Sequence, residues 1–352
     1  GVWIMAYTTI DNPFKYFNTV TYSGNGSNPR TLTGVGFQPD WVWLKNRTDS
    51  NGHTLADAVR GANKTLSSDG TGAEVTDKSD GHLDAFTSDG FTVGAGSSSD
   101  ARVNDGSHTY VAWNWLAGGS ASSNSNGSIT SSVSANTTAG FSIVSYTGTG
   151  SNATVGHGLG ANMDFAIFKL RSGSSAWLVY HKSLGATKAI YLNETGAVGT
   201  NSSGFNDTEP TSSVFSLGSG ATANTSSGTQ IAYCFAEKKG YSKFGSYTGN
   251  GNADGPFVYT GFKPAWVLFK KSSGTNNWNL YDNKRDTFNP ESNLLYPSLS
   301  DAEASFSGVD FVSNGIKIKT SNTNFNDSGG TYIFMAFAEA PFVTAGTKAA
   351  GT

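Results

Sequence analysis

Three segments of the chain carry the same residues at the same spacing. In each, a tyrosine is followed 23 residues later by a lysine that ends an apolar run, and a threonine opens a closing apolar run 83 to 87 residues after the tyrosine. The markers are Tyr22, Lys45 and Thr109, then Tyr146, Lys169 and Thr229, then Tyr247, Lys270 and Thr331. Such constant spacing predicts three copies of one folded unit.

The apolar runs have the length and composition of β-strands. Residues 266–269 (Trp-Val-Leu-Phe) form an uninterrupted apolar run that is too short for a helix and is typical of a strand covered on both faces. Asn-Gly and Asp-Gly pairs recur between the runs and favour hairpin turns, because Asn, Asp and above all Gly accept positive φ. The sequence therefore predicts an all-β protein of three tandem antiparallel β-sandwiches, of the jelly-roll or lectin-like kind.

The repeats divide the chain into six parts. Residues 118–139 are rich in Ser, Gly and Asn, which predicts a flexible linker, whereas only residues 238–240 separate the second and third repeats, which we expect to pack as a stiff pair. We expect a leader or attachment segment over residues 1–15 and a frayed tail over 342–352. The three β-sandwich repeats are predicted over residues 16–117, 140–240 and 241–341.

Composition and motifs exclude several classes of protein. Charged residues make up 14% of the chain and the net charge is −3, so no long-range attraction to nucleic acid is expected. We find no apolar stretch near 18 residues and expect no membrane insertion. Cys234 is the only cysteine, which rules out an internal disulfide. Without a serine-hydrolase, zinc-protease or phosphate-loop motif, we expect neither enzymatic activity nor a cofactor or metal, although oxygen-rich loops leave a calcium site open.

An Asp-x-x-Arg pair stands at equivalent places in the first and third repeats. One interpretation is a recognition site, in which the carboxylate accepts hydrogen bonds from sugar hydroxyls and the guanidinium binds an acidic group. The alternative is an ion pair that fixes a loop. The pairs are Asp57 with Arg60 and Asp282 with Arg285, and the second repeat has His181 and Leu184 instead.

Two tryptophans are candidate platforms for a glycan. Trp177 and Trp278 each lie eight residues after the lysine of their repeat, in a predicted loop where an indole stacks on sugars if it is exposed. Core packing is expected instead for the tryptophans in predicted core strands, Trp41, Trp43, Trp113 and Trp115. The third repeat is also locally basic, which suits either an anionic cell-surface polymer or an ordinary solvated face.

Four stretches resemble repeats in structural proteins of marine tailed bacteriophages. They are residues 5–11, 36–47, 255–266 and 329–341. The resemblance implies a virion protein, often a fibre or tail component, with sandwiches of the concanavalin type. It implies no agreed catalytic residues, and the second repeat matches least well.

These observations lead to one leading hypothesis and two alternatives. The leading hypothesis is a non-enzymatic tail fibre or appendage of the virion that is made in the host cytoplasm and contacts the host surface, with other virion proteins and a host polysaccharide as partners. By analogy with phage fibres we expect a homotrimer. The alternatives are a capsid decoration or capsid fibre protein and a polysaccharide-binding or depolymerising protein.

Overall fold

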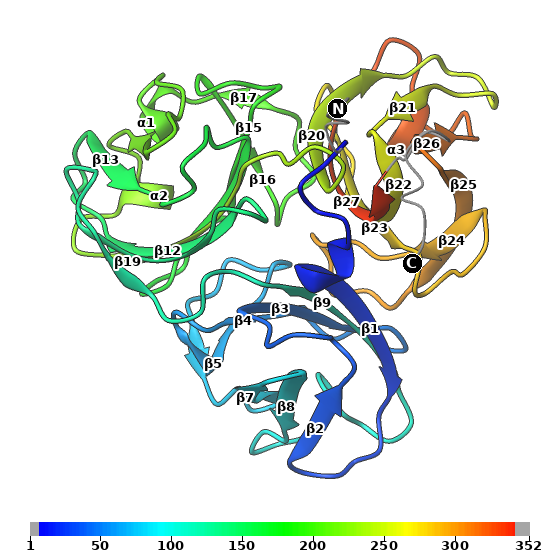
Figure 1. Ribbon diagram of the computed structural model, residues 1–352, viewed down its shortest axis with the longest axis horizontal. Helices are drawn as coiled ribbons and strands as arrows, with labels where there is room; N and C mark the ends of the chain where they lie inside the picture. Colours follow the sequence, from blue (N-terminus) through cyan, green and yellow to red (C-terminus); the bar gives the residue numbers. More distant parts are fainter. Residues whose placement is uncertain (1–6, 342–352) are drawn as a thin grey trace, which may run out of the picture.

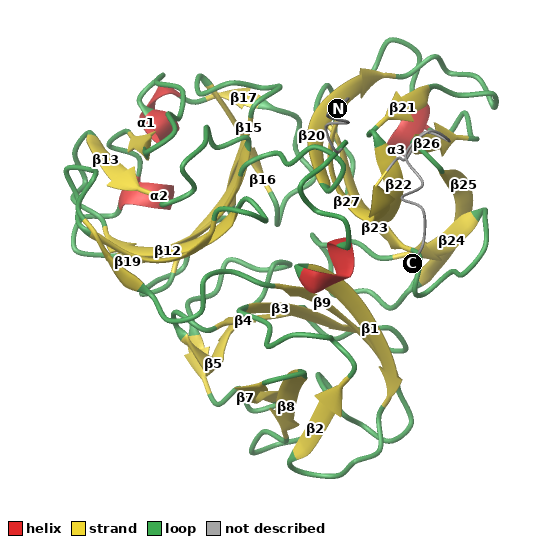
Figure 2. Cartoon of the chain, in the orientation of Figure 1, coloured by secondary structure: helices red, strands yellow, loops and turns green. Residues whose placement is uncertain are grey.

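The three repeats surround a common centre. The computed structural model describes residues 7–341, and Figure 1 shows three β lobes, coloured blue, green and yellow to red, that meet in the middle of the molecule. We call residues 16–117 unit 1, residues 118–240 unit 2 and residues 241–341 unit 3. Within residues 7–341 helix is limited to single turns (Figure 2), and no helix is long and apolar enough to cross a membrane. The turns are η1 (Pro13–Lys15), α1 (Ser202–Phe205), α2 (Ala221–Asn224) and α3 (Thr323–Asn326).

Each unit contributes one large sheet with the same central strand order. In unit 1 the order is β1 (Phe17–Ser23), β9 (Thr109–Trp115), β3 (Trp41–Asn46), β4 (Thr54–Asp57), β5 (Gly61–Leu66) and β6 (Val75–Thr76). In unit 2 it is β10 (Ser122–Asn124), β11 (Ser131–Asn136), β12 (Phe141–Thr147), β19 (Thr229–Phe235), β14 (Phe165–Leu170), β15 (Leu178–His181), β16 (Lys188–Tyr191) and β17 (Gly199–Thr200). In unit 3 it is β20 (Ser242–Thr248), β27 (Thr331–Pro341), β22 (Phe262–Lys271) and β23 (Trp278–Asp282).

A second, smaller sheet covers the outer face of each large sheet. Figure 1 shows these sheets at the periphery of the molecule, with the large sheets toward the centre. The strands are β2 (Arg30–Thr33), β8 (Gly90–Gly94) and β7 (His82–Thr87) in unit 1, β13 (Ala153–Gly156) and β18 (Val214–Leu217) in unit 2, and β21 (Phe257–Tyr259), β26 (Gly315–Ile318), β25 (Ala304–Val312) and β24 (Glu291–Leu294) in unit 3. The named strands pair antiparallel, so the predicted all-β sandwich fold is confirmed.

The strands of the large sheets are buried on both faces. All six residues of β3 are buried. Because side chains alternate along a strand, Val42 and Leu44 enter the core between the two sheets of unit 1, whereas Trp41 and Trp43 point to the other side. This explains why the sequence shows continuous rather than alternating apolar runs: each large sheet lies between two cores.

The inner faces of the three large sheets share one aromatic core. The ring centroids of Trp41 and Tyr233, from units 1 and 2, lie 4.3 Å apart. Those of Trp115 and Trp266, from units 1 and 3, lie 5.7 Å apart. Aromatic side chains bury large apolar areas, so this centre contributes to holding the three units together.

The predicted flexible linker is wrong. Residues 118–139 contain β10 and β11, and β11 pairs with β12 in a register that sets Val133 opposite Val144. The amide of Gly118 also donates to the hydroxyl of Ser134 at 3.0 Å. The Ser-rich composition misleads because these strands extend the edge of a sheet, where backbone hydrogen bonds hold polar residues in place. Units 2 and 3 do pack against each other, but units 1 and 2 and units 3 and 1 do so as well.

The predicted leader is also part of the body where the structure describes it. Ile10 is 1% exposed and belongs to the central aromatic core. The hydroxyl of Tyr7 donates to the carbonyl of Gly261 in unit 3 at 2.9 Å. Residues 1–6 and the predicted tail, 342–352, lie outside the described residues.

Candidate functional site

The Asp-x-x-Arg pair of unit 1 is buried where unit 1 meets unit 2. The side chains of Asp57 and Arg60 are fully buried, with 2.5 Å between Oδ2 and Nε. Asp57 lies at the end of β4, where its Oδ1 accepts from the amides of Val59 and Arg60 and closes a tight turn. Arg60 in turn donates to the carbonyl of Leu55 at 2.9 Å. The local sequence thus holds the ion pair in one geometry.

Unit 2 completes this pair. The hydroxyl of Tyr233, on β19, donates to Oδ2 of Asp57 at 2.8 Å and accepts from Arg60 at 3.2 Å. Burial alone would lower the pKa of Arg60, but Asp57, Tyr233 and Glu74 outweigh it and raise that pKa above its usual value. The guanidinium is therefore permanently charged, and its N–H groups are satisfied where units 1 and 2 meet. We call such a contact between two units a seam.

The pair of unit 3 meets unit 1 in the same manner. Nε of Arg285 lies 2.6 Å from Oδ2 of Asp282. The indole N–H of Trp113, on β9, donates to the same oxygen at 2.9 Å, and the guanidinium lies 5.7 Å from the centre of a Trp113 ring. The two predicted recognition pairs are thus internal contacts, and the alternative interpretation of an ion pair that fixes local structure describes them better.

A second layer of charge surrounds each pair. Glu74 of unit 1 binds both Arg60 and, across the seam, Arg171 of unit 2, at 3.1 and 2.8 Å. Burial raises the pKa of Glu74, but the hydrogen bonds from Arg171 and the charge of Arg60 reverse the shift and hold it below its usual range. In the seam between units 3 and 1 the corresponding three residues are Glu303, Arg285 and Arg47.

The seam between units 2 and 3 has different chemistry. Nδ1 of His181 accepts from the amide of Ser183 at 3.0 Å, so Nε2 carries the hydrogen that it directs at the carbonyl of Phe334, 3.2 Å away in unit 3. Burial lowers the pKa of His181 to about 4, which keeps the ring neutral. Val198 and Ser272 occupy the places of Glu74 and Arg171.

At every seam, the side chain eight residues after the strand lysine makes a hydrogen bond to the neighbouring unit through a ring nitrogen. The indole of Trp177 donates to the carbonyl of Ser67 in unit 1 at 2.9 Å, and that of Trp278 donates to Tyr191 in unit 2 at 2.9 Å. In unit 1 the equivalent residue is His53, 3.1 Å from the carbonyl of Tyr296 in unit 3.

The prediction that Trp177 and Trp278 are sugar platforms is therefore wrong. Their exposures are 0% and 1%, and both belong to the shared aromatic core. Each indole N–H donates to a carbonyl of the preceding unit, and the rings are buried. Neither ring therefore has a surface on which a sugar could stack.

One segment of each unit crosses onto the next unit. We call residues 67–74, 191–198 and 296–303 the straps. Each strap ends on the same backbone hydrogen bond of 2.9 Å, from Glu74 to Arg171, from Val198 to Ser272, and from Glu303 to Arg47. The straps therefore connect unit 1 to 2, 2 to 3 and 3 to 1, which closes a ring of head-to-tail contacts.

Two of the three strand lysines donate hydrogen bonds to the straps. Lys45, Lys169 and Lys270 are fully buried, and burial lowers the pKa of each to about 8. The ammonium groups of Lys169 and Lys270 donate to the strap carbonyls of Thr71 and Thr195 at 3.1 and 3.2 Å. These side chains hold the seams together and are closed to solvent.

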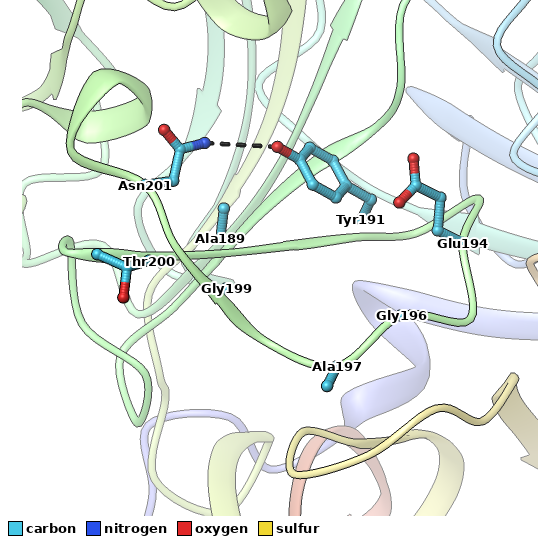
Figure 3. Close-up of a pocket in the computed structure, with 8 residues that line it drawn as sticks. All are labelled: Ala189, Tyr191, Glu194, Gly196, Ala197, Gly199, Thr200 and Asn201. Carbon is cyan, nitrogen blue, oxygen red and sulfur yellow. Dashed lines mark hydrogen bonds between the residues drawn. The ribbon is translucent and has the colours of Figure 1, made fainter.

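A hollow of about 310 Å³ lies beside the strap of unit 2. Figure 3 shows its lining, in which Asn201 donates to the hydroxyl of Tyr191 at 3.4 Å and the carboxylate of Glu194 stands at one end. The strap of unit 1 borders a similar hollow of about 260 Å³, lined by Asp69 and Arg102 among others. Because the hollow recurs with a different lining, we attribute it to the strap architecture.

Sequence reasoning missed the partners across the seams. Trp113 and Tyr233 lie at equivalent positions of the closing strands, opposite Trp43 and Ile167. The repeat alignment gave no signal for them, because each donor binds the Asp of another unit and the third repeat, which has Asp282, carries Met335 at this position. Within residues 7–341 no group of three or more His, Cys, Asp or Glu is placed to hold a metal ion.

The geometry defines a class of protein in which three β-sandwich units are closed into one body by cyclic seams. The chain belongs to the family described as a domain of unknown function, DUF7483, whose model matches residues 12–341 and so spans all three units. No curated protein and no solved structure matches the sequence.

Proposed function

We propose that this chain is a non-enzymatic structural protein of a phage particle, most simply a tail fibre or appendage component that contacts the host surface. The observation that carries the proposal is the closed ring of seams. In this ring the two Asp/Arg pairs and the ring nitrogens of His53, Trp177 and Trp278 all bind across seams. They fix the positions of the three sandwiches relative to one another. A protein built in this way serves as a rigid mount for its peripheral loops.

The surface favours unit 3 as the part that makes contact. Among the residues that the structure describes, the large aromatic side chains that are exposed all lie there: Phe257 at 48%, Tyr259 at 55% and Phe288 at 84%. Exposed aromatic side chains are typical of binding surfaces, because they offer apolar area at little cost in conformational entropy.

The resemblance to phage structural proteins supplies the setting, and particle composition tests it. We expect the chain in purified virions of the phage that encodes it, in a fixed copy number by quantitative mass spectrometry, with antibody labelling at the tail. Finding it in the lysate but not in purified particles would overturn the proposal.

A second location is favoured by the threefold outline of the ring in Figure 1. A body with three similar corners suits a threefold position of a capsid lattice, which is the place of a decoration protein. Antibody labelling over the capsid, away from the tail, would assign this role and exclude the tail role.

The homotrimer stays a prediction. Because the three units already saturate one another's seams, a trimer would have to form through the outer sheets or the chain ends. Light scattering on the purified chain measures this, and a mass of one 36.8 kDa chain excludes a self-assembled trimer.

A further inference from the structure

Unit 3 carries an insertion that units 1 and 2 lack. Leu66 and Ile190, which pair with the strands after the lysine strands, lie 21 residues beyond Lys45 and Lys169, whereas the equivalent Leu295 lies 25 residues beyond Lys270. The four extra residues fall in the loop between Arg285 and Leu295. Asn289 fixes this loop on β25, since its amide group donates to the carbonyl of Phe311 and accepts from the amide of the same residue, both at 2.8 Å.

The insertion forms one wall of a hollow of about 250 Å³, which we call the insertion hollow. Glu291 lines it and is 3% exposed, and its Oε2 is buried without a hydrogen bond from any residue that the structure describes. Oδ1 of Asn283, which also lines the hollow, is buried and unpartnered in the same sense. Buried polar atoms without partners are costly, so two of them beside one hollow indicate a place for a hydrogen-bonding ligand.

The two unpartnered groups of the hollow carry no charge, whereas Lys263, Lys284 and Glu339 bring charge to its lining. Burial, assisted by Asp286 and Asp282, raises the pKa of Glu291 to about 8, so near pH 7 its carboxyl group is protonated, and it offers a hydroxyl donor as well as an acceptor. The ammonium of Lys263 at the wall is already paired with Glu339 at 2.6 Å. Because the two unpartnered groups are uncharged, they disfavour a metal ion and favour a neutral molecule with adjacent hydroxyl groups.

An apolar surface stands beside these polar groups. Phe288, within the insertion, lines the hollow and is 84% exposed. A sugar ring presents an apolar C–H face and hydroxyl groups on its edge, and this is the combination that an aromatic ring beside unpartnered polar atoms accommodates.

We propose that the insertion hollow binds one neutral sugar residue of a surface polysaccharide, with Phe288 against the ring face and with Glu291 and Asn283 hydrogen bonded to adjacent hydroxyls. The proposal rests on the proposed contact with a host surface and names its chemistry. Units 1 and 2 lack the insertion that forms one wall of this hollow.

The test is saturation-transfer NMR on the full chain with four free monosaccharides: glucose, galactose, mannose and N-acetylglucosamine. We expect transfer to the C–H protons of at least one sugar, with a Kd on the order of 1 mM. Phe288→Ala should weaken binding by about tenfold. Phe257→Ala, which removes an exposed aromatic side chain outside the hollow, should leave it unchanged.

The role of Glu291 is tested by two further variants. Glu291→Gln keeps a donor and an acceptor and should stay within about threefold of the wild type, whereas Glu291→Ala should lose about tenfold or more. If Glu291→Gln binds the sugar as weakly as Glu291→Ala, then Glu291 does not act as a neutral donor and acceptor. Both variants remove a buried acid, so their folding is checked by the same near-ultraviolet spectrum as the wild type.

Failure of this proposal is distinct from failure of the virion role. If none of the four sugars shows saturation transfer at tens of millimolar, the insertion hollow is not a sugar site, even for a chain found in particles. If a sugar binds but the chain is missing from purified particles, the virion role is wrong and the binding site stands.

Discussion

Two seams of this molecule, the charged seams, bury an aspartate with its arginine, whereas the third, the neutral seam, has the uncharged His181 in that place. At the seams between units 1 and 2 and between units 3 and 1, an aspartate on one unit accepts a hydrogen bond from an aromatic side chain on the next, Tyr233 or Trp113. At the seam between units 2 and 3 the residue equivalent to these donors is Met335, opposite Leu268 on β22, which has no N–H or O–H to donate.

The difference follows from what a buried carboxylate requires. A buried charge is tolerated only when opposite charge and hydrogen bonds satisfy it, so an aspartate facing Met335 would lack one of its partners. His181 is neutral there and needs only a carbonyl acceptor. The comparison teaches that the backbone contacts of the straps, which are alike in all three seams, define the architecture, while the polar groups vary as matched sets.

The largest effect is expected from breaking one matched set. Arg60→Leu gives unit 1 the residue that unit 2 has at Leu184, but it leaves Asp57 buried without its cation. We expect a loss of about 3–5 kcal/mol in the free energy of unfolding, measured by denaturant titration. Arg285→Leu should cost a similar amount at the other charged seam.

The matched control replaces the whole set rather than one member. The triple variant Asp57→His, Arg60→Leu and Tyr233→Met copies the seam between units 2 and 3, and we expect it to recover most of the loss, since exchanging a buried ionic group for a well-packed neutral one is often neutral in energy. A triple variant less stable than Arg60→Leu alone would contradict the idea of matched sets.

The contribution of the neutral seam to stability should depend on pH. The pKa of His181 is about 4 in the folded chain against an ordinary 6.5, so the unfolded chain binds the proton more tightly. The stability from the neutral ring is fully present above pH 6.5 and is lost as the pH falls toward 4, by about 3 kcal/mol in total. His53 and His157 also have lowered pKa values, so the measurement is the difference between wild type and His181→Gln. A difference that does not change between pH 4 and 7 would mean that the pKa of His181 is the same in the folded and unfolded chains, which would contradict a ring kept neutral by burial.

A smaller effect is expected from removing one aromatic donor. Tyr233→Phe keeps the ring against Trp41 but takes away the hydrogen bond to Asp57, which should cost about 2 kcal/mol. Met335→Leu is the control at the equivalent position of the neutral seam and should change the free energy of unfolding by less than about 1.5 kcal/mol. Equal losses in the two variants would mean that packing, and not the hydrogen bond, matters at this position.

The sequence predicted the sandwich fold because strand patterning and turn residues are local signals, and its continuous apolar runs indicated strands covered on both faces. It did not reveal that the second face of each large sheet is covered by the other units, because this depends on which strands of distant repeats meet. For the same reason Trp177 resembled a loop platform although it is buried against Ser67. The insertion hollow was missed because Asn283 and Glu291 are eight residues apart and only the fold aligns them on one cavity.

The smallest effect should come from the outer layer of charge. Arg171→Ser copies Ser272 of the neutral seam and leaves Glu74 bound to Arg60. Because the side chain of Arg171 is 18% exposed and the strap backbone bond remains, we expect a loss of at most about 1 kcal/mol. Salt should shrink it further, since solvent reaches this pair, whereas the loss in Arg60→Leu should be nearly independent of salt. If Arg171→Ser lowers the free energy of unfolding as much as Arg60→Leu does, then the outer ion pairs stabilise the charged seams as much as the buried Asp/Arg pairs.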